Sequence, residues 1–117
     1  MSDDTTIRLI EASLAARSLR SRVIANNIAN INTPGFRRGQ VQFEQLLEQA
    51  LRGGHGRDPA KLEPQVVQPM DTPFNDAGSD VSLDQEIGDM VTNSAMYKTY
   101  MRVLERMYRQ MDMAMAE

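Results

Sequence analysis

A heptad repeat in the last third of this 117-residue chain limits its possible folds more than any other feature. Apolar residues recur at alternating three- and four-residue steps, and Ser82-Leu83-Asp84-Gln85 ahead of them fits a capping box. The pattern predicts a helix over about 82–116 that packs along a partner helix as a coiled coil. The predicted seam, broken only by the small Ser94, consists of Leu83, Ile87, Met90, Tyr97, Met101, Leu104, Tyr108, Met111 and Met115.

A second helix is predicted over about 5–30, where apolar residues again follow helical spacing. It ends in an unusual cluster of asparagines, although asparagine has a low helix propensity. We hypothesise that this polar face hydrogen-bonds neighbouring subunits, and the alternative is a frayed helix end with local capping. Pro34-Gly35 then fits the centre of a type II turn. The candidate assembly motif consists of Asn26, Asn27, Ile28, Asn30, Asn32, Thr33, Pro34, Gly35 and Phe36.

The segment between the two helices carries weaker signals. Val41 and Phe43 alternate with polar residues, as in a short extended piece, and Leu46, Leu47 and Leu51 suit one or two helical turns. Residues 52–80 hold four of the seven glycines and four of the five prolines, so we expect this stretch to be mobile in the isolated chain.

These segments together predict one all-α domain. The first helix (1–33) and the heptad helix (81–117) form an antiparallel coiled-coil hairpin, because the chain must return through the middle. The middle segment (34–80) is expected to be a turn followed by extended, irregular and partly disordered chain. A two-helix hairpin leaves apolar surface open, which indicates a subunit that packs among copies or relatives.

No catalytic or metal-binding pattern is present, and we expect neither an enzyme nor a cofactor, metal site or small-molecule substrate. The chain has no cysteine, and its single histidine, His55, lies in a glycine-rich stretch. The acidic pair Glu86 and Asp89 is expected on an open helix surface. The arginines, Arg37 and Arg38 among them, are interpreted as solvated; without interleaved aromatic residues they do not indicate nucleic-acid binding.

The charge is uneven along the chain. Residues 1–57 carry eight basic and five acidic side chains, a net charge of +3, whereas residues 58–117 carry five basic and eleven acidic ones, a net charge of −6. The acidic second half argues against nucleic acid as a partner. Neither a secretory signal peptide nor an apolar run of membrane-spanning length is visible.

The run from Ala25 to Phe36 resembles the N-terminal signature of the bacterial flagellar axial proteins, in particular the rod and hook group. In that group an Asn-Ile-Ala-Asn core, followed by Asn/Asp-Thr-Pro-Gly and an aromatic residue, ends the first helix. The stretch from Val81 to Ile87, with Asn93, Tyr97 and Leu104 after it, also resembles the family. Residues 7–51 and 78–116 carry the resemblance, which is greatest to the short proximal rod proteins.

The resemblance implies a structural subunit of the proximal rod, the drive shaft of the basal body. It implies copies of the chain, other rod proteins, inner-membrane ring or junction proteins and the export apparatus as partners. It also implies a periplasmic location reached through flagellar type III export without signal cleavage. Two alternatives stay open, another short rod protein of the same family and a cytosolic coiled-coil adaptor.

Overall fold

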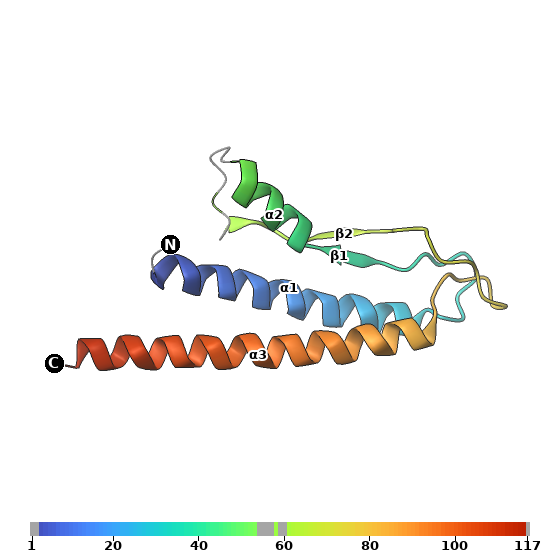
Figure 1. Ribbon diagram of the computed structural model, residues 1–117. Helices are drawn as coiled ribbons and strands as arrows, with labels where there is room; N and C mark the ends of the chain where they lie inside the picture. Colours follow the sequence, from blue (N-terminus) through green and yellow to red (C-terminus); the bar gives the residue numbers. More distant parts are fainter. Residues whose placement is uncertain (1–2, 54–57, 59–60, 117) are drawn as a thin grey trace.

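Two long antiparallel helices form the body of the protein, as the computed structural model shows for residues 3–53, 58 and 61–116 (Figure 1). Helix α1 spans Asp3–Ala29 and helix α3 spans Leu83–Met115, with strand β1 (Gln40–Gln42), helix α2 (Glu44–Gly53) and strand β2 (Gln65–Val67) between them. The molecule measures 63 × 31 × 14 Å. The predicted all-α hairpin is confirmed, and its two chain ends lie at the same end of the long axis.

Both long helices begin with recognisable signals, and a glycine turn follows the end of α1. The Ser82 side chain accepts a hydrogen bond from the Gln85 backbone N–H, which caps α3 as the capping-box pattern predicts. Asp3 and Asp4 place negative charge in the first turn of α1, where it interacts favourably with the positive end of the helix dipole. After α1, Gly35 adopts a φ of 80° and the chain turns away.

The hydrophobic core between the helices is small. Ile7 and Leu14 of α1 and Leu104 of α3 are buried, with four partly buried neighbours packed against them, Ile10, Tyr100, Met101 and Met107. This core occupies the end of the hairpin that holds the chain termini. Nearer the turns, buried polar side chains such as Asn27 and Glu86 lie among buried apolar ones such as Ile24 and Val81.

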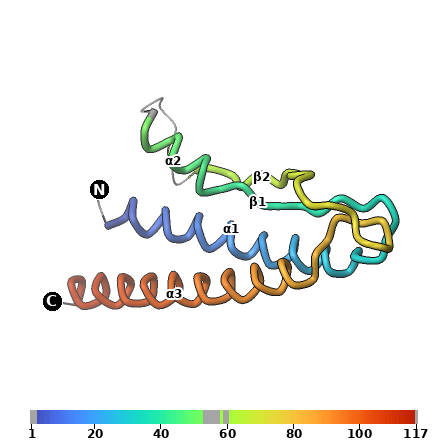
Figure 2. The backbone as a smooth tube through the Cα atoms, turned by 45° about the vertical axis from the view of Figure 1, so that its right-hand side comes forward, coloured from blue at the N-terminus to red at the C-terminus, as the bar shows by residue number. Residues whose placement is uncertain are grey.

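A two-stranded ribbon lies along α1 on the side away from α3 (Figure 2). Strands β1 and β2 are antiparallel, with Val41 opposite Val66. Val41 and Phe43 are buried under the ribbon, which confirms the predicted extended piece. Helix α2 follows directly and is longer than the one or two turns predicted.

The sequence did not predict strand β2 or the ordered segment that follows it, because residues 52–80 were expected to be mobile. Their order comes from pairing with β1 and with the turn after α1, which are contacts between distant parts of the chain. His55 lies outside the described residues. Within the described part of the chain, no helix is long and apolar enough to cross a lipid bilayer.

Candidate assembly motif and helix seam

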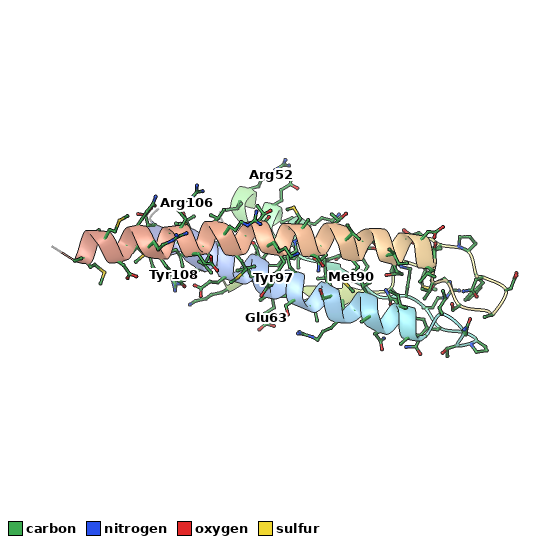
Figure 3. All side chains as sticks on the ribbon, turned by 90° about the horizontal axis from the view of Figure 1, so that it is seen from below. Arg52, Glu63, Met90, Tyr97, Arg106 and Tyr108 are labelled. Carbon is green, nitrogen blue, oxygen red and sulfur yellow. The ribbon has the colours of Figure 1, made fainter. Side chains whose placement is uncertain are left out.

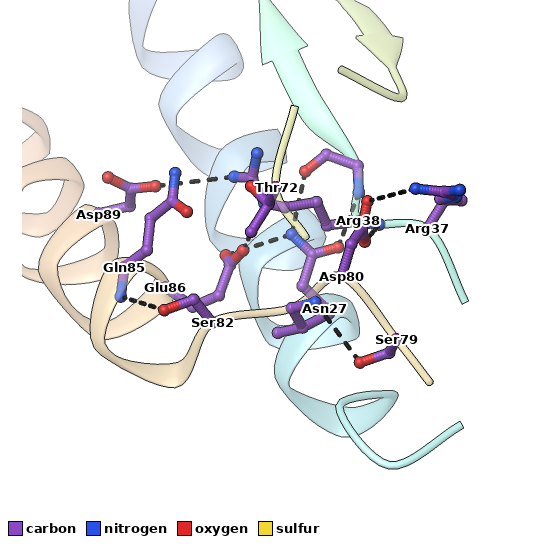
Figure 4. Close-up of polar contacts among 12 residues, drawn as sticks. Asn27, Arg37, Arg38, Thr72, Ser79, Asp80, Ser82, Gln85, Glu86 and Asp89 are labelled. Carbon is purple, nitrogen blue, oxygen red and sulfur yellow. Dashed lines mark hydrogen bonds and ion pairs between the residues drawn. The ribbon is translucent and has the colours of Figure 1, made fainter. Parts of the chain in front are cut away.

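Asn27 joins three elements at the turn end of the hairpin (Figure 4). Its side-chain amide donates to the Gly39 carbonyl at 2.9 Å and accepts from the Gly39 backbone N–H at 2.9 Å. The same amide donates to a carboxylate oxygen of Glu86 on α3 at 3.2 Å. Asn27 is buried and bonds within its own chain, so in the single chain its side chain is not presented to a neighbouring subunit.

Glu86 and Arg38 form a buried ion pair beside Asn27. The Arg38 Nε donates to Glu86 at 2.8 Å, and neither side chain is more than 4% exposed. Asp89, half exposed, lies 3.8 Å from the same guanidinium. The sequence-based expectation of a solvated Arg38 and a surface Glu86 is therefore wrong. Burying two charges is costly unless each is paired and hydrogen-bonded, and here both conditions hold.

Asp80 ties the segment before α3 to the strand after α1. One carboxylate oxygen accepts the Arg38 backbone N–H at 2.6 Å, and the other lies 3.6 Å from the Arg37 guanidinium. The Arg37 guanidinium also stacks over the Phe74 ring at 4.1 Å. These contacts hold residues 36–38 and 74–80 side by side.

Asn75 organises the loop at the tip of the hairpin. Its amide nitrogen donates to the Ile31 carbonyl at 3.1 Å, and its oxygen accepts the backbone N–H of Ala77 and Ser79. The buried Ser79 hydroxyl also donates to Ile31, at 2.6 Å. Two backbone bonds, from Gly35 to Gly78 and from Asp80 to Phe36, complete the junction.

The rest of the candidate motif lies mostly at the surface. Asn26, Asn32, Thr33 and Pro34 are exposed, whereas Ile28, Asn30 and Phe36 are half-buried. Asn30 donates to the Asn26 carbonyl at 2.8 Å and accepts from the Thr33 hydroxyl at 3.2 Å. Asn30 thus caps the helix end locally, as the alternative interpretation holds, and Asn26 and Asn32 still present polar side chains outward.

A second polar bridge joins the two long helices midway along. The buried Asn93 amide donates to the Arg17 carbonyl at 2.8 Å and to the Ser21 hydroxyl at 3.1 Å. Because these bonds need fixed partners, they set the register of α3 on α1 more tightly than apolar contacts alone would.

Glu44, at the start of α2, anchors the ribbon to α1. Arg20 binds its carboxylate through both terminal nitrogens, and Arg17 lies 3.2 Å from it. The hydrogen bonds from Arg20 lower the pKa of Glu44, and the charges of Arg20 and Arg17 add to that effect. Arg20 also donates to the Val41 carbonyl at 3.1 Å, so one side chain fixes both β1 and α2.

The predicted seam of α3 is only partly turned toward α1. The line that contacts α1 runs through Glu86, Met90, Asn93, Tyr100, Leu104 and Met107. Among the predicted seam residues, Met90, Met101 and Leu104 are buried or half-buried. Those exposed in the single chain are Leu83, Ile87, Tyr97, Tyr108, Met111 and Met115.

The described residues offer no evident site for a cofactor. No group of three or more His, Asp or Glu side chains within the described part of the chain is placed to hold a metal ion. A cavity of about 280 Å³ lies between α1, β1 and α3 and is lined in part by Arg17, Arg38 and Asp89. Its arginines are already opposed by Glu44, Glu86 and Asp89.

Sequence reasoning missed Arg38, Asp80 and Glu86 because it treated charged residues as surface residues. One signal was available, since Glu86, Asn93 and Leu104 share a helix face with the apolar residues between them. A charged or amide side chain on such an apolar helix face indicates a buried ion pair or a polar bridge to a neighbouring element. Its partner, Arg38, is 48 positions away and could not be identified from local spacing.

Comparison with known proteins gives a consistent family assignment. The family model described as flagella basal body rod protein matches residues 11–37, the segment that includes the asparagine cluster and the turn. The chain is 33% identical to the flagellar basal body rod protein FlgB of Borreliella burgdorferi over 98 residues, covering 68% of this chain and 73% of that protein.

Two further relatives align along most of their length. The chain is 31% identical to FlgB of Aeromonas hydrophila, covering 85% of this chain and 83% of that protein. It is 29% identical to FlgB of Bacillus subtilis, covering 87% of this chain and 84% of that protein. The chain therefore belongs to the family of flagellar basal body rod proteins and is a structural component of the rod.

Proposed function

We propose that this chain is a subunit of the proximal rod that transmits torque by helix packing with copies of itself and with other rod proteins. The observation that carries the proposal is the open flank of α3. Leu83 and Ile87 are 45% and 49% exposed, although they continue the same heptad series as the buried Leu104. Large apolar side chains at heptad spacing indicate a further helix as the missing partner.

Figure 3 shows Met90, Tyr97 and Tyr108 along one side of α3, next to α1. Partial desolvation and the nearby Glu11 carboxylate of α1 raise the pKa of the Tyr108 hydroxyl. The two helices thus offer one continuous surface, on which a third helix would rest between them.

The composition of the surface suits neighbours that are not identical. Seven of the nine methionines lie between residues 90 and 115. Methionine is flexible and adapts its shape to different partners, as a subunit at a junction between different proteins requires. On this basis we propose inner-membrane ring or junction proteins, besides other rod subunits, as contacts.

The proposed location is the periplasmic rod, reached through the flagellar export apparatus without removal of a signal peptide. Passage through a narrow channel requires a chain that unfolds readily. The sequence has no cysteine to form disulfides, and the buried apolar residues between α1 and α3 are few. The proposed role is mechanical and assigns no catalysis, cofactor or nucleic acid to the chain.

A complementation experiment tests the proposed flank. Cells lacking the gene receive the wild-type chain, Ile87→Asp on the flank, or Gln49→Asp at an exposed position of α2. Ile87→Asp is expected to be exported but to prevent rod assembly and swimming, because a desolvated carboxylate would oppose helix packing. Gln49→Asp adds the same charge elsewhere and is expected to restore swimming. Normal rods with Ile87→Asp would contradict the proposal.

A further inference from the structure

The end of α3 carries an arginine face that the proposed flank does not include. Arg102, Arg106 and Arg109 follow helical spacing, so their side chains share one side of the helix. Figure 3 shows Arg106 on the side of α3 opposite Tyr97 and Tyr108. None of the three arginines forms an ion pair with another described residue, although ion pairs occur elsewhere in the molecule.

The same face also exposes apolar surface. Met113 lies in line with Arg102, Arg106 and Arg109, and its side chain is 67% exposed. On α3 this face lies opposite the buried Leu104, which packs on α1, so α1 does not cover it. The last turns of α3 also extend past the start of α1 (Figure 1). Three guanidinium groups without an ion-pair partner in the described part of the chain, together with an exposed methionine, form a surface suited to an acidic, partly apolar partner.

The opposite end of the hairpin has the complementary composition. Residues 69–89 contain six carboxylates and no lysine or arginine. Arg37 and Arg38 neutralise Asp80 and Glu86 in the buried junction. The exposed carboxylates left at this acidic tip are Asp71, Asp76 and Asp84, with Asp89 at 3.8 Å from Arg38.

The acidic tip also carries exposed apolar side chains. Met70 is 59% exposed and Phe74 is 49% exposed. Met70 has a φ of 56°, a backbone conformation that non-glycine residues rarely adopt and that costs about 1 kcal/mol. A strained residue that points an apolar side chain into solvent is consistent with a docking surface.

We propose that the acidic tip of one copy docks on the arginine face of a second copy, so that copies associate end to end. The two surfaces match in charge, and each adds exposed methionine. They cannot meet within one chain, because they lie at opposite ends of a molecule 63 Å long. The inference rests on the proposed structural function. It adds a second copy as the partner and a head-to-tail orientation of the two copies.

Charge reversal tests this docking with the full chain in solution. Sedimentation at low salt is expected to show association of the wild type that weakens by at least tenfold in 0.5 M salt, since exposed ion pairs are screened. The triple variant Arg102→Glu/Arg106→Glu/Arg109→Glu and the triple variant Asp71→Lys/Asp76→Lys/Asp84→Lys are each expected to stay monomeric. An equimolar mixture of the two variants is expected to associate again.

A matched control and a cross-link make the test specific. The control Arg8→Glu/Arg22→Glu/Arg52→Glu reverses three exposed arginines away from the arginine face and is expected to associate as the wild type does. Because the chain lacks cysteine, Pro73→Cys and Met113→Cys chains can be mixed and oxidised. Disulfide-linked heterodimers are expected in excess of homodimers, and the Arg102/Arg106/Arg109 reversal is expected to abolish them.

Several results would overturn the end-to-end contact. These are a monomeric wild type at low salt, association insensitive to the arginine reversal, no recovery on mixing, or cross-linked homodimers only. If such a result accompanied normal rods in cells and a loss of rods with Ile87→Asp, the end-to-end contact alone would be wrong. The proposed function itself would be contradicted by a different result, namely normal rods in cells that carry Ile87→Asp.

Discussion

Asn27 of α1 donates a hydrogen bond to Glu86 of α3 at 3.2 Å, across 59 positions of sequence. The central asparagine of the candidate motif therefore acts inside the subunit, where it fixes the position of α3 and of the ribbon. The motif can still serve assembly indirectly, because the junction sets the direction in which the exposed turn after α1 projects. Its buried and exposed asparagines should consequently respond differently to substitution.

Asn27→Ala should destabilise the isolated protein strongly. It removes three hydrogen bonds and leaves both backbone groups of Gly39 without their side-chain partner, at a cost of about 3 kcal/mol in unfolding free energy. Asn26→Ala is the matched control, since Asn26 is exposed, and it should change stability by less than about 0.5 kcal/mol. Urea denaturation followed by circular dichroism measures both. Equal effects of the two substitutions would contradict the assigned role of Asn27.

Arg38 and Glu86 should show strong energetic coupling. Arg38→Met leaves a buried carboxylate without its cation, and we expect a loss of about 3–5 kcal/mol. Glu86→Gln keeps the shape of the side chain but removes its charge, and should also destabilise. The double variant should lose clearly less than the sum of the single losses. Additive losses in a denaturant double-mutant cycle would show that the two side chains are not coupled.

Gly88 and Gly35 occupy backbone positions that should respond in opposite ways to alanine. It lies within α3, and a Cβ added there would meet no atom within 4 Å. Gly88→Ala should therefore stabilise the isolated chain by about 0.5–1 kcal/mol through helix propensity. Gly35→Ala should instead destabilise by about 1 kcal/mol, because Gly35 has a φ of +80°. Thermal unfolding of the two variants should shift in opposite directions, and a shared direction would argue against these backbone assignments.

The Glu44 ion pairs should make stability depend on pH in the acid range. Hydrogen bonds from Arg20 hold the folded-state pKa of Glu44 below its usual value of 4.5. The contribution is therefore fully present above pH 4.5 and is lost as the pH falls through the folded-state pKa. Because the carboxylate is half exposed, the effect should stay below about 1 kcal/mol.

Glu44→Gln should remove this part of the pH dependence, as urea midpoints measured from pH 6 down to pH 3 can show. Glu48→Gln is a suitable control, since among the residues that the structure describes Glu48 pairs with Arg52 at the surface of α2. An unchanged pH profile for Glu44→Gln would mean that the anchor between α2 and α1 contributes little to stability.

Much of the architecture could be predicted because it depends on local signals. The cap at Ser82, the spacing of apolar residues and the Pro34-Gly35 turn each act over a few residues, and they located both helices and the end of α1. The return of the chain through the middle then required an antiparallel hairpin. These conclusions needed no knowledge of distant contacts.

The remaining features depend on distant pairing. Strand β2 has only three residues, and its order comes from β1, which precedes it by more than twenty positions. The ion pair between Arg38 and Glu86 is likewise invisible to local spacing. Heptad spacing located an apolar stripe on α3 but could not tell which part faces α1, because neighbouring lines of the helix also carry apolar residues.

Cryo-electron tomography of cells that lack this gene tests the central claim most directly. A structural rod subunit with this place in the basal body predicts inner-membrane rings with no rod above them, and recovery of the rod when the wild-type gene is restored. Intact rods and hooks in cells without the gene would contradict the claim.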